Sequence, residues 1–508
     1  MAAQRTQAAP DRGASDGAAQ LPPLTQRARV GIVVVALAVL LLSIASWVWF
    51  MAHALRAPVG QYDFSTYYAA AAALRANPHA DIYTSSVIAA TGASAHVQVQ
   101  PPLPFTYPPL VAYLFIPFTF FSFHVAARLW MAANAVLWLG CALVLAYDLR
   151  LRFDQTLAAA TGAVSTAPVS NRTTAPARLW SRAVVDPAPW VAAAAAAALC
   201  LAFTPAAQTV LLGQVNFLVL LPLVAVPWLT RHRHERWVGI AIAVAAMIKL
   251  TPAALLIYLA LRRRWSALLA ALVALAALSL ASIALIGPQV FFALVPQALR
   301  VGGGDATLGH NEALFAPAIA GISAVAPRLA GPLHVAEYAL LALLALALGW
   351  VLWHAPRARR DQAAPPLLAS DWPAYAVALC GMVLLSPTAW VHHYLWLLPA
   401  ATLALMPLAL ALRWIAGARL RVALGQRATR LALLAIGGSV LLSLALPHEW
   451  DTQPKPATSL LLGLPVRWVM LEFRPVGAVL ILLVAAWLAL RGGAFTTASP
   501  RPDDSASR

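Results

Sequence analysis

Long uncharged apolar blocks constrain this chain more than any other feature of its sequence. The first, Val30–Ala52, contains no charged residue across 23 positions. A helix needs about 20 apolar residues to cross the hydrocarbon layer of a bilayer, whereas membrane-spanning strands show short alternating segments. Comparable blocks recur near residues 125–147, 189–230, 238–261, 265–287, 334–353, 373–414, 431–446 and 475–490. These blocks predict an all-α integral membrane protein with about ten to twelve transmembrane helices.

The overall composition and charge agree with a membrane protein. The chain is 61% hydrophobic and 10% charged, whereas soluble chains carry roughly 25% charged residues. The net charge of +17 comes from short basic clusters between the apolar blocks, so it indicates membrane topology and not a nucleic-acid partner. Three cysteines, Cys141, Cys200 and Cys380, lie inside apolar blocks without CxxC spacing. We therefore expect no disulfide framework, no bound metal and no cofactor.

The basic clusters also predict which loops face the cytoplasm, because Lys and Arg flank the cytoplasmic ends of membrane spans. Placing these clusters inside leaves a large first outer loop at 53–124. Within it, Pro109–Phe121 is only 13 residues long, so we predict an interfacial helix. The Ala/Thr/Ser-rich stretch 148–187 is a predicted cytoplasmic insertion. The remaining predicted units are a disordered cytoplasmic tail at 1–25, a membrane domain at 26–492 and a disordered cytoplasmic tail at 493–508.

Two segments are predicted to turn within or next to the membrane. Spans near 189–205 and 212–230 form a predicted hairpin whose outer turn holds Gln208–Gln214. Block 238–261 has a Lys and a Pro at its centre, in Lys249–Pro252. This centre predicts two short helices that meet at a turn inside the protein. A single kinked span is the alternative.

Several polar side chains from separate segments fall on or near the predicted outer face. Ionisable groups at membrane depth are costly and usually mark a function, so their convergence predicts a cavity there. Lys249, near the middle of its block, is a further candidate. The converging residues are Asp63, Gln214, Asn216, His310, Asn311, His392 and His393.

Each candidate also has a purely structural interpretation. Asp63 follows the first span, where an isolated Asp also serves as a helix N-cap. Gln214 and Asn216 suit a cap or an inter-helix hydrogen bond, and Lys249 suits snorkelling or a structural pair. His392-His393 suits an interfacial aromatic belt. As metal ligands these histidines are poor, because adjacent helical residues point about 100° apart.

Five motifs follow one another along the chain. They are Asp63–Ala70; Tyr107–Leu110; Gly213–Asn216; Lys249–Pro252 followed by Arg262–Trp265; and Ser386-Pro387 with Trp390 and His392-His393. In this order they resemble glycosyltransferase family 87, the bacterial type-C glycosyltransferases that use polyprenyl-phosphate sugars. The resemblance covers roughly residues 60–415. One departure is Asn311-Glu312-Ala313, where the family tends to show an Asn-x-Ser-type stretch.

The resemblance implies a type-C bundle with a large first outer loop and an acidic base, Asp63, at the start of that loop. It implies transfer of a hexose, mannose in particular, from a polyprenyl-phosphate donor to a glycolipid or polysaccharide acceptor. The reaction would run at the outer face of a bacterial inner membrane. A single displacement gives inversion at the sugar carbon. The implied donor- or acceptor-binding residues are Tyr67, Tyr68, Gln214, Asn216, Lys249, His392 and His393.

Two other classes of function compete with this one. A lipid or sugar transporter, including a flippase, would also be a polytopic protein, and so would a non-catalytic membrane subunit. Transporters often contain internal repeats and bind substrate at the midplane. The chain has no clear internal repeat, and its polar residues converge on one face. Both features favour the transferase.

Overall fold

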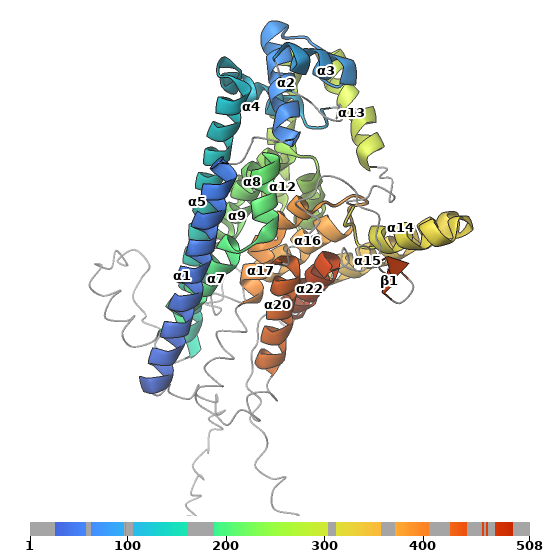
Figure 1. Cartoon of the computed structure of the whole chain (residues 1–508). Coiled ribbons are helices and arrows are strands. Elements are labelled where there is room, and N and C mark those ends of the chain that lie inside the picture. The colour runs from blue at the N-terminus through green and yellow to red at the C-terminus, as the bar shows by residue number, and fades with distance from the viewer. Residues whose placement is uncertain are drawn as a thin grey trace, which may run out of the picture.

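A computed structural model shows a helical bundle with one end covered by short helices (Figure 1). Its only strands among the described residues are β1 (Leu460–Leu461) and β2 (Leu464–Pro465), a two-stranded antiparallel pair. The all-α fold class is therefore confirmed. The structure describes residues 26–56, 62–95, 97, 105–160, 187–302, 311–356, 371–405, 427–443, 460–461, 464–465 and 473–490.

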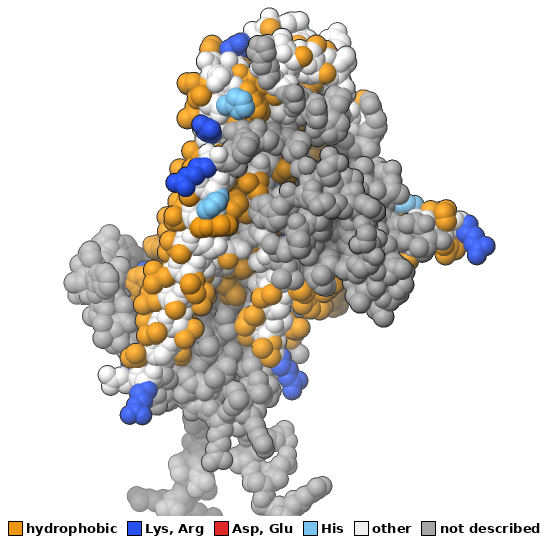
Figure 2. Space-filling view, in the orientation of Figure 1, with side chains coloured by type: hydrophobic (Ala, Val, Ile, Leu, Met, Phe, Trp, Pro, Cys, Tyr) orange, Lys and Arg blue, Asp and Glu red, His pale blue; other side chains and the backbone are white. Residues whose placement is uncertain are grey.

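Two long helices lie side by side along one flank of the bundle, α1 (Gln26–Arg56) and α5 (Phe123–Ala160) (Figure 1). Hydrophobic side chains cover the outward surface of α1, with basic side chains at its lower end (Figure 2). Leu42, for example, is 70% exposed in this region. An apolar surface of this extent is stable against lipid and not against water.

Helix α5 extends beyond the predicted span at 125–147 and into the predicted cytoplasmic insertion at 148–187. It continues to Ala160. Asp148 and Arg152 form a buried ion pair one turn apart, at 2.7 Å, and Leu149 and Phe153 are fully buried. The i,i+4 pair and the apolar face support the extra turns. The rest of the predicted insertion, 161–186, lies outside the described residues, as do both predicted tails.

The predicted hairpin is formed by α7 (Ala188–Leu201) and α8 (Thr204–Leu212) on one side and α9 (Asn216–Arg231) on the other. The predicted turn was too long, because Gln208 lies within α8. The helix ends at Gly213, whose φ of 66° is left-handed, a conformation that favours glycine. The turn is therefore Gly213–Val215, and it presents Gln214 between two helix ends.

The break predicted in block 238–261 is confirmed. Helix α10 (Glu235–Ile248) ends at Lys249, whose backbone is extended, with φ −148° and ψ 131°. The chain resumes as a 3-10 turn, η3 (Thr251–Ala254), and then α11 (Leu255–Leu261). Pro252 has no N–H to continue the helical hydrogen bonding, so the chain turns here.

Short helices from residues 53–124, the predicted first outer loop, and from the segment after α12 (Trp265–Ile286) cover one end of the bundle (Figure 1). Helix α4 and η1 confirm that Pro109–Phe121 is not a full-length span. Aromatic side chains of the first outer loop, among them Phe64, Phe105 and Phe115, are fully buried there. The covering elements are α2 (Tyr62–Ala76), α3 (Ser85–Ser94), α4 (Pro109–Phe115), η1 (Ile116–Phe120) and α13 (Pro288–Gly302).

The C-terminal half completes the bundle around a buried α16, which packs against α15 and α22. Its elements are α14 (Ala316–Val325), η4 (Pro327–Leu329), α15 (Ala330–His354), α16 (Trp372–Leu384), η5 (Val391–Leu397), α17 (Leu398–Ala404), α20 (Arg427–Ser443) and α22 (Phe473–Leu490).

Five helical stretches within the described residues are long and apolar enough to cross a membrane, and six further apolar helices are shorter. The chain is thus a multi-pass membrane protein. The predicted total of about ten to twelve crossings stays a prediction. The five stretches are Arg29–Arg56, Phe123–Asp154, Ala188–Leu212, Trp265–Ile286 and Pro327–His354.

Candidate active site

Asp63 stands in the first turn of α2, half-buried beneath the outer-loop helices. Gln214, from the turn between α8 and α9, hydrogen-bonds its carboxylate. Burial raises the pKa of the Asp63 carboxyl to about 6, although the Gln214 hydrogen bond and the positive charge of Lys249 lower it. A carboxylate with this pKa is ionised at neutral pH and accepts a proton more readily than an exposed aspartate.

The orientation of Gln214 is fixed by two tyrosines. Tyr67 and Tyr107 each donate a hydroxyl hydrogen bond of 3.0 Å to Gln214 Oε1. Because Oε1 accepts both bonds, the amide NH₂ is directed to the Asp63 carboxylate. Trp130 of α5 also binds this turn, because its indole N–H donates to Gly213 O at 2.8 Å.

Lys249 reaches the same region because α10 stops at this residue. Its Nζ lies 3.3 Å from Asn216 Oδ1 and 2.8 Å from His393 Nε2. The ammonium also lies over the rings of Tyr107, 5.5 Å from the centroid, and Trp396, at 5.2 Å. These neighbours are all uncharged, and no carboxylate of the described residues lies within ion-pair distance of Lys249. The lysine is thus suited to an anionic ligand.

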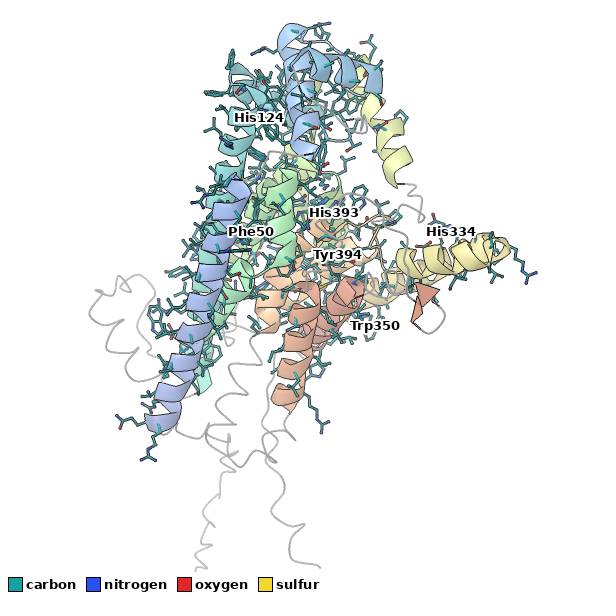
Figure 3. The ribbon with its side chains drawn as sticks, viewed as in Figure 1. Phe50, His124, His334, Trp350, His393 and Tyr394 are labelled. Carbon is teal, nitrogen blue, oxygen red and sulfur yellow. The ribbon has the colours of Figure 1, made fainter. Side chains whose placement is uncertain are left out.

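The two histidines of the His392-His393 turn have different environments. His393 contacts Lys249, stacks on Trp396 with centroids 4.9 Å apart, and lines a cavity. Figure 3 shows His393 near the middle of the molecule, far from His124 and His334. His392 is also buried, but it does not line that cavity, and its backbone oxygen accepts a 3.3 Å hydrogen bond from Asn216.

The cavity next to Lys249 has a volume of about 490 Å³ and two chemically distinct parts. One end is polar, with Tyr107, Lys249, Thr388 and His393 among its lining residues. The rest is an apolar groove along α11, α15 and α16. Its wall includes Ile257, Leu261, Ala345, Leu348, Gly349, Leu352, Val377, Ala378, Gly381 and Met382.

The groove is accessible from outside the bundle. Ile257, one of its lining residues, is an apolar side chain that is 63% exposed. An amphiphile can therefore place its head group at Lys249 while its tail lies against apolar side chains and continues into the bilayer.

The structure brings together most of the residues predicted for the site: Asp63, Tyr67, Gln214, Asn216, Lys249 and His393. Tyr68 is not among them, because its hydroxyl donates to Phe121 O at 2.8 Å and its ring packs on Phe123. His310 lies outside the described residues. Among those described, no group of three or more His, Cys, Asp or Glu side chains is arranged to hold a metal ion.

Tyr107 begins one of the five sequence motifs, but the motif predicted no role for it. The structure places Tyr107 between the two charged groups: its hydroxyl binds Gln214, and its ring faces Lys249. A tyrosine just before a Pro-Pro pair in an otherwise apolar loop was the available signal.

The fold and site define a multi-pass membrane protein with a carboxylate and an ammonium group next to a lipid-accessible groove. The sequence profile of glycosyltransferase family 87 matches residues 105–387, more than half of the chain. The chain therefore belongs to this family, as the motifs predicted.

Two mycobacterial relatives are similar to this chain. One is named polyprenol-phosphate-mannose-dependent alpha-(1-2)-phosphatidylinositol mannoside mannosyltransferase, from Mycolicibacterium smegmatis. It is 32% identical over 323 residues, 61% of this chain and 63% of the relative. A protein of the same name from Mycobacterium tuberculosis is 31% identical over 314 residues, 61% of this chain and 64% of the relative.

A third relative, from Mycolicibacterium smegmatis, is named as the corresponding pentamannoside mannosyltransferase. It is 28% identical over 359 residues, 69% of this chain and 71% of the relative. The chain thus spans a little under two thirds of the length of the first two relatives and slightly more of the third.

The unequal placement of the two histidines gives a first prediction. His393→Ala is expected to weaken binding of an anionic amphiphile in the cavity roughly tenfold, because it removes a polar contact of Lys249 at the cavity wall. His392→Ala is expected to lower thermal stability while leaving that affinity within about threefold of wild type. The Kd for a polyprenyl phosphate and the melting temperature of both variants check this. If neither variant changes the Kd, the turn serves packing alone.

Proposed function

We propose that this chain is a membrane glycosyltransferase that moves a hexose, mannose in particular, from a polyprenyl-phosphate donor to a glycolipid or polysaccharide acceptor. One observation carries the proposal. A cation, Lys249, lies at the polar end of the cavity, and a carboxylate, Asp63, is linked to it through Gln214 and Tyr107. The names of the three relatives support mannose as the sugar and a lipid as the acceptor.

In this proposal the donor is bound by both parts of the cavity. Its phosphate lies at Lys249 and His393, where charge-assisted hydrogen bonds form. Its polyprenyl chain lies in the apolar groove along α11, α15 and α16. The sugar then lies on the Asp63 side of the phosphate, near Tyr107 and Gln214.

The reaction is a single displacement at the anomeric carbon. The Asp63 carboxylate accepts the proton of the acceptor hydroxyl as its oxygen bonds to that carbon. The bond between the anomeric carbon and the phosphate oxygen breaks, and the electron pair leaves with polyprenyl phosphate. The Lys249 ammonium stabilises the additional negative charge. Attack from the side opposite the phosphate inverts the sugar carbon.

We further propose that the site opens at the outer face of a bacterial inner membrane. The domain division proposed for the chain is a membrane domain at 26–492, with its first outer loop at 53–124. Arginines between the apolar blocks support this orientation through the positive-inside rule.

A direct assay separates the transferase from a transporter or an assembly subunit. Purified protein is incubated with radiolabelled polyprenyl-phosphate mannose and membrane lipid extract, and the products are separated. A transferase yields a new labelled product. A flippase moves the labelled donor across vesicles without changing it, and that outcome would reject the proposal.

The groove gives a second prediction. A Cβ added at Gly349 meets no atom within 4 Å, so a larger side chain there extends into the groove without displacing backbone. We expect Gly349→Leu to fold normally and to raise KM for the lipid-linked donor roughly tenfold, because it occupies space for the tail. A water-soluble donor with a very short prenyl chain should be affected less.

Gly331→Leu is the matched control. Gly331 lies on the same helix, α15, and a Cβ there also meets no atom within 4 Å, but it does not line the cavity. Its KM for the donor should match that of wild type. Equal KM values in the two variants would show that the groove does not hold the tail.

A further inference from the structure

A short segment, Asn311–Ala313, is hydrogen-bonded to the stretch of chain that precedes His393. Asn311 Oδ1 accepts the backbone N–H of Ala389 at 3.0 Å, and Asn311 Nδ2 donates to Pro387 O at 3.1 Å. The backbone N–H of Glu312 donates to Ala389 O at 2.6 Å. Four residues beyond Ala389 is His393, the residue that contacts Lys249. These hydrogen bonds therefore hold the stretch Pro387–Ala389, which leads to His393.

Tyr394, the residue after His393, makes a further hydrogen bond to this segment. The hydroxyl of Tyr394 donates to Glu312 O at 2.5 Å. Figure 3 shows Tyr394 beside His393 in the middle of the bundle. Hydrogen bonds to residues 311 and 312 thus come from both ends of the turn that carries His393, which restricts the movement of that turn.

The segment is itself anchored by a buried ion pair. Glu312 Oε1 lies 2.7 Å from Arg474 Nη1, and the two side chains are 1% and 2% exposed. Arg474 belongs to the first turn of α22, beyond the part of the chain that matches the family profile. Burying two charges carries a large desolvation cost, so such a pair is poor evidence of added stability. A role in fixing one arrangement of the chain accounts better for its presence.

We infer that Glu312 and Arg474 are positioning residues for the site. Their ion pair fixes Asn311–Ala313, whose hydrogen bonds fix the turn Pro387–His393, and His393 is thereby held against Lys249. The effect on transfer rests on the proposed function. The effect on the turn itself does not.

The decisive variant replaces both charges at once, as Glu312→Leu together with Arg474→Met. Apolar replacement of a buried ion pair is generally neutral or stabilising, so melting temperature should stay close to wild type. A positioning role predicts that kcat/KM for the donor still falls roughly tenfold or more, since small displacements in a site cost activity. If the folded double variant keeps the kcat/KM of wild type, the pair has only a structural role and the inference is overturned.

Hydrogen–deuterium exchange gives a readout that does not depend on activity. The amides of Glu312 and Ala389 should exchange roughly tenfold faster in the double variant, while amides of α5 exchange unchanged. Unchanged exchange at both amides would also overturn the inference. If the wild-type protein shows no transfer at all, the proposed function fails, and the exchange comparison still decides whether the pair holds the turn.

Tyr394→Phe tests the same support with a smaller change, and it decides the question if the double variant does not fold. It removes the hydroxyl that binds Glu312 and should raise donor KM about threefold or more. Tyr375→Phe is the matched control, because its buried hydroxyl donates to Leu223 O at 3.0 Å and not to the segment Asn311–Ala313. Equal effects of the two substitutions on KM would contradict the positioning role.

Discussion

An Asp63→Asn variant is expected to fold, to bind donor and to lose transfer activity by roughly 10² to 10⁴-fold. The asparagine keeps the size of the side chain and an oxygen that accepts from Gln214, which hydrogen-bonds the native carboxylate. It removes the only group at this position that accepts a proton from the acceptor hydroxyl. Initial rates at saturating donor measure the loss, and a donor-binding assay shows that the site is otherwise intact.

Asp81→Asn is the control for this variant. Asp81 also lies in the first outer loop, but its carboxylate accepts from Tyr83 N at 3.1 Å and from Thr84 Oγ1 at 2.6 Å, as part of a local turn. Asparagine preserves such a turn, so activity should be unchanged. If Asp63→Asn also stays within about threefold of wild type, Asp63 is a helix-end residue and the proposed mechanism lacks its base.

The pH profile provides a related check on Asp63. Because burial raises its pKa to about 6, the carboxylate is ionised at neutral pH and becomes protonated as pH falls. The kcat/KM for transfer should therefore decline about tenfold per pH unit well below this pKa. The residual activity of Asp63→Asn should lack this decline. A variant with the same acidic limb would assign the limb to another group.

A Lys249→Met variant is expected to bind the donor roughly 10- to 100-fold more weakly than wild type while folding normally. Hydrogen bonds to charged groups contribute about 1.5–3 kcal/mol, which corresponds to this range of affinity. Methionine has similar length and suits the apolar block, so loss of a buried ammonium should not reduce stability. Donor Kd and melting temperature of the purified variant are the two measurements.

Arg75→Met controls for general loss of positive charge. The guanidinium of Arg75 donates to Thr119 O at 2.6 Å and lies over the Phe120 ring, within the outer-loop helices and away from the cavity. Its removal should leave donor affinity unchanged. A donor Kd for Lys249→Met equal to that of wild type would show that Lys249 does not meet the phosphate.

The sequence was informative where chemistry and local backbone signals coincide. Lys249 and Pro252 interrupt an apolar block, and both the break in the helix and the position of the lysine followed from that interruption. Gly213 lies within the predicted turn at 208–214, and it is the residue at which α8 ends. With the basic clusters placed in the cytoplasm, Asp63, Gln214 and His393 were predicted to lie on one face. The structure joins them through Tyr107 and Lys249.

Other features depend on tertiary contacts that no local pattern encodes. Tyr67 and Tyr68 are adjacent and chemically identical, yet only Tyr67 faces Gln214, because neighbouring helical residues point in different directions. Arg474 is one arginine among many near a membrane boundary, and its partner Glu312 is 162 positions away. The continuation of α5 past residue 147 likewise depends on a buried ion pair and on apolar contacts.

The long sequence separations within the site bear on how the protein is made. Tyr67 and Gln214 are 147 positions apart, Lys249 and His393 are 144 apart, and Arg474 lies close to the end of the described chain. Membrane helices enter the bilayer in order during synthesis, and non-local contacts form only once both partners are present. A nascent chain therefore has no assembled site until the segment that carries His393 has been synthesised. Chains that terminate before His393 should be inactive.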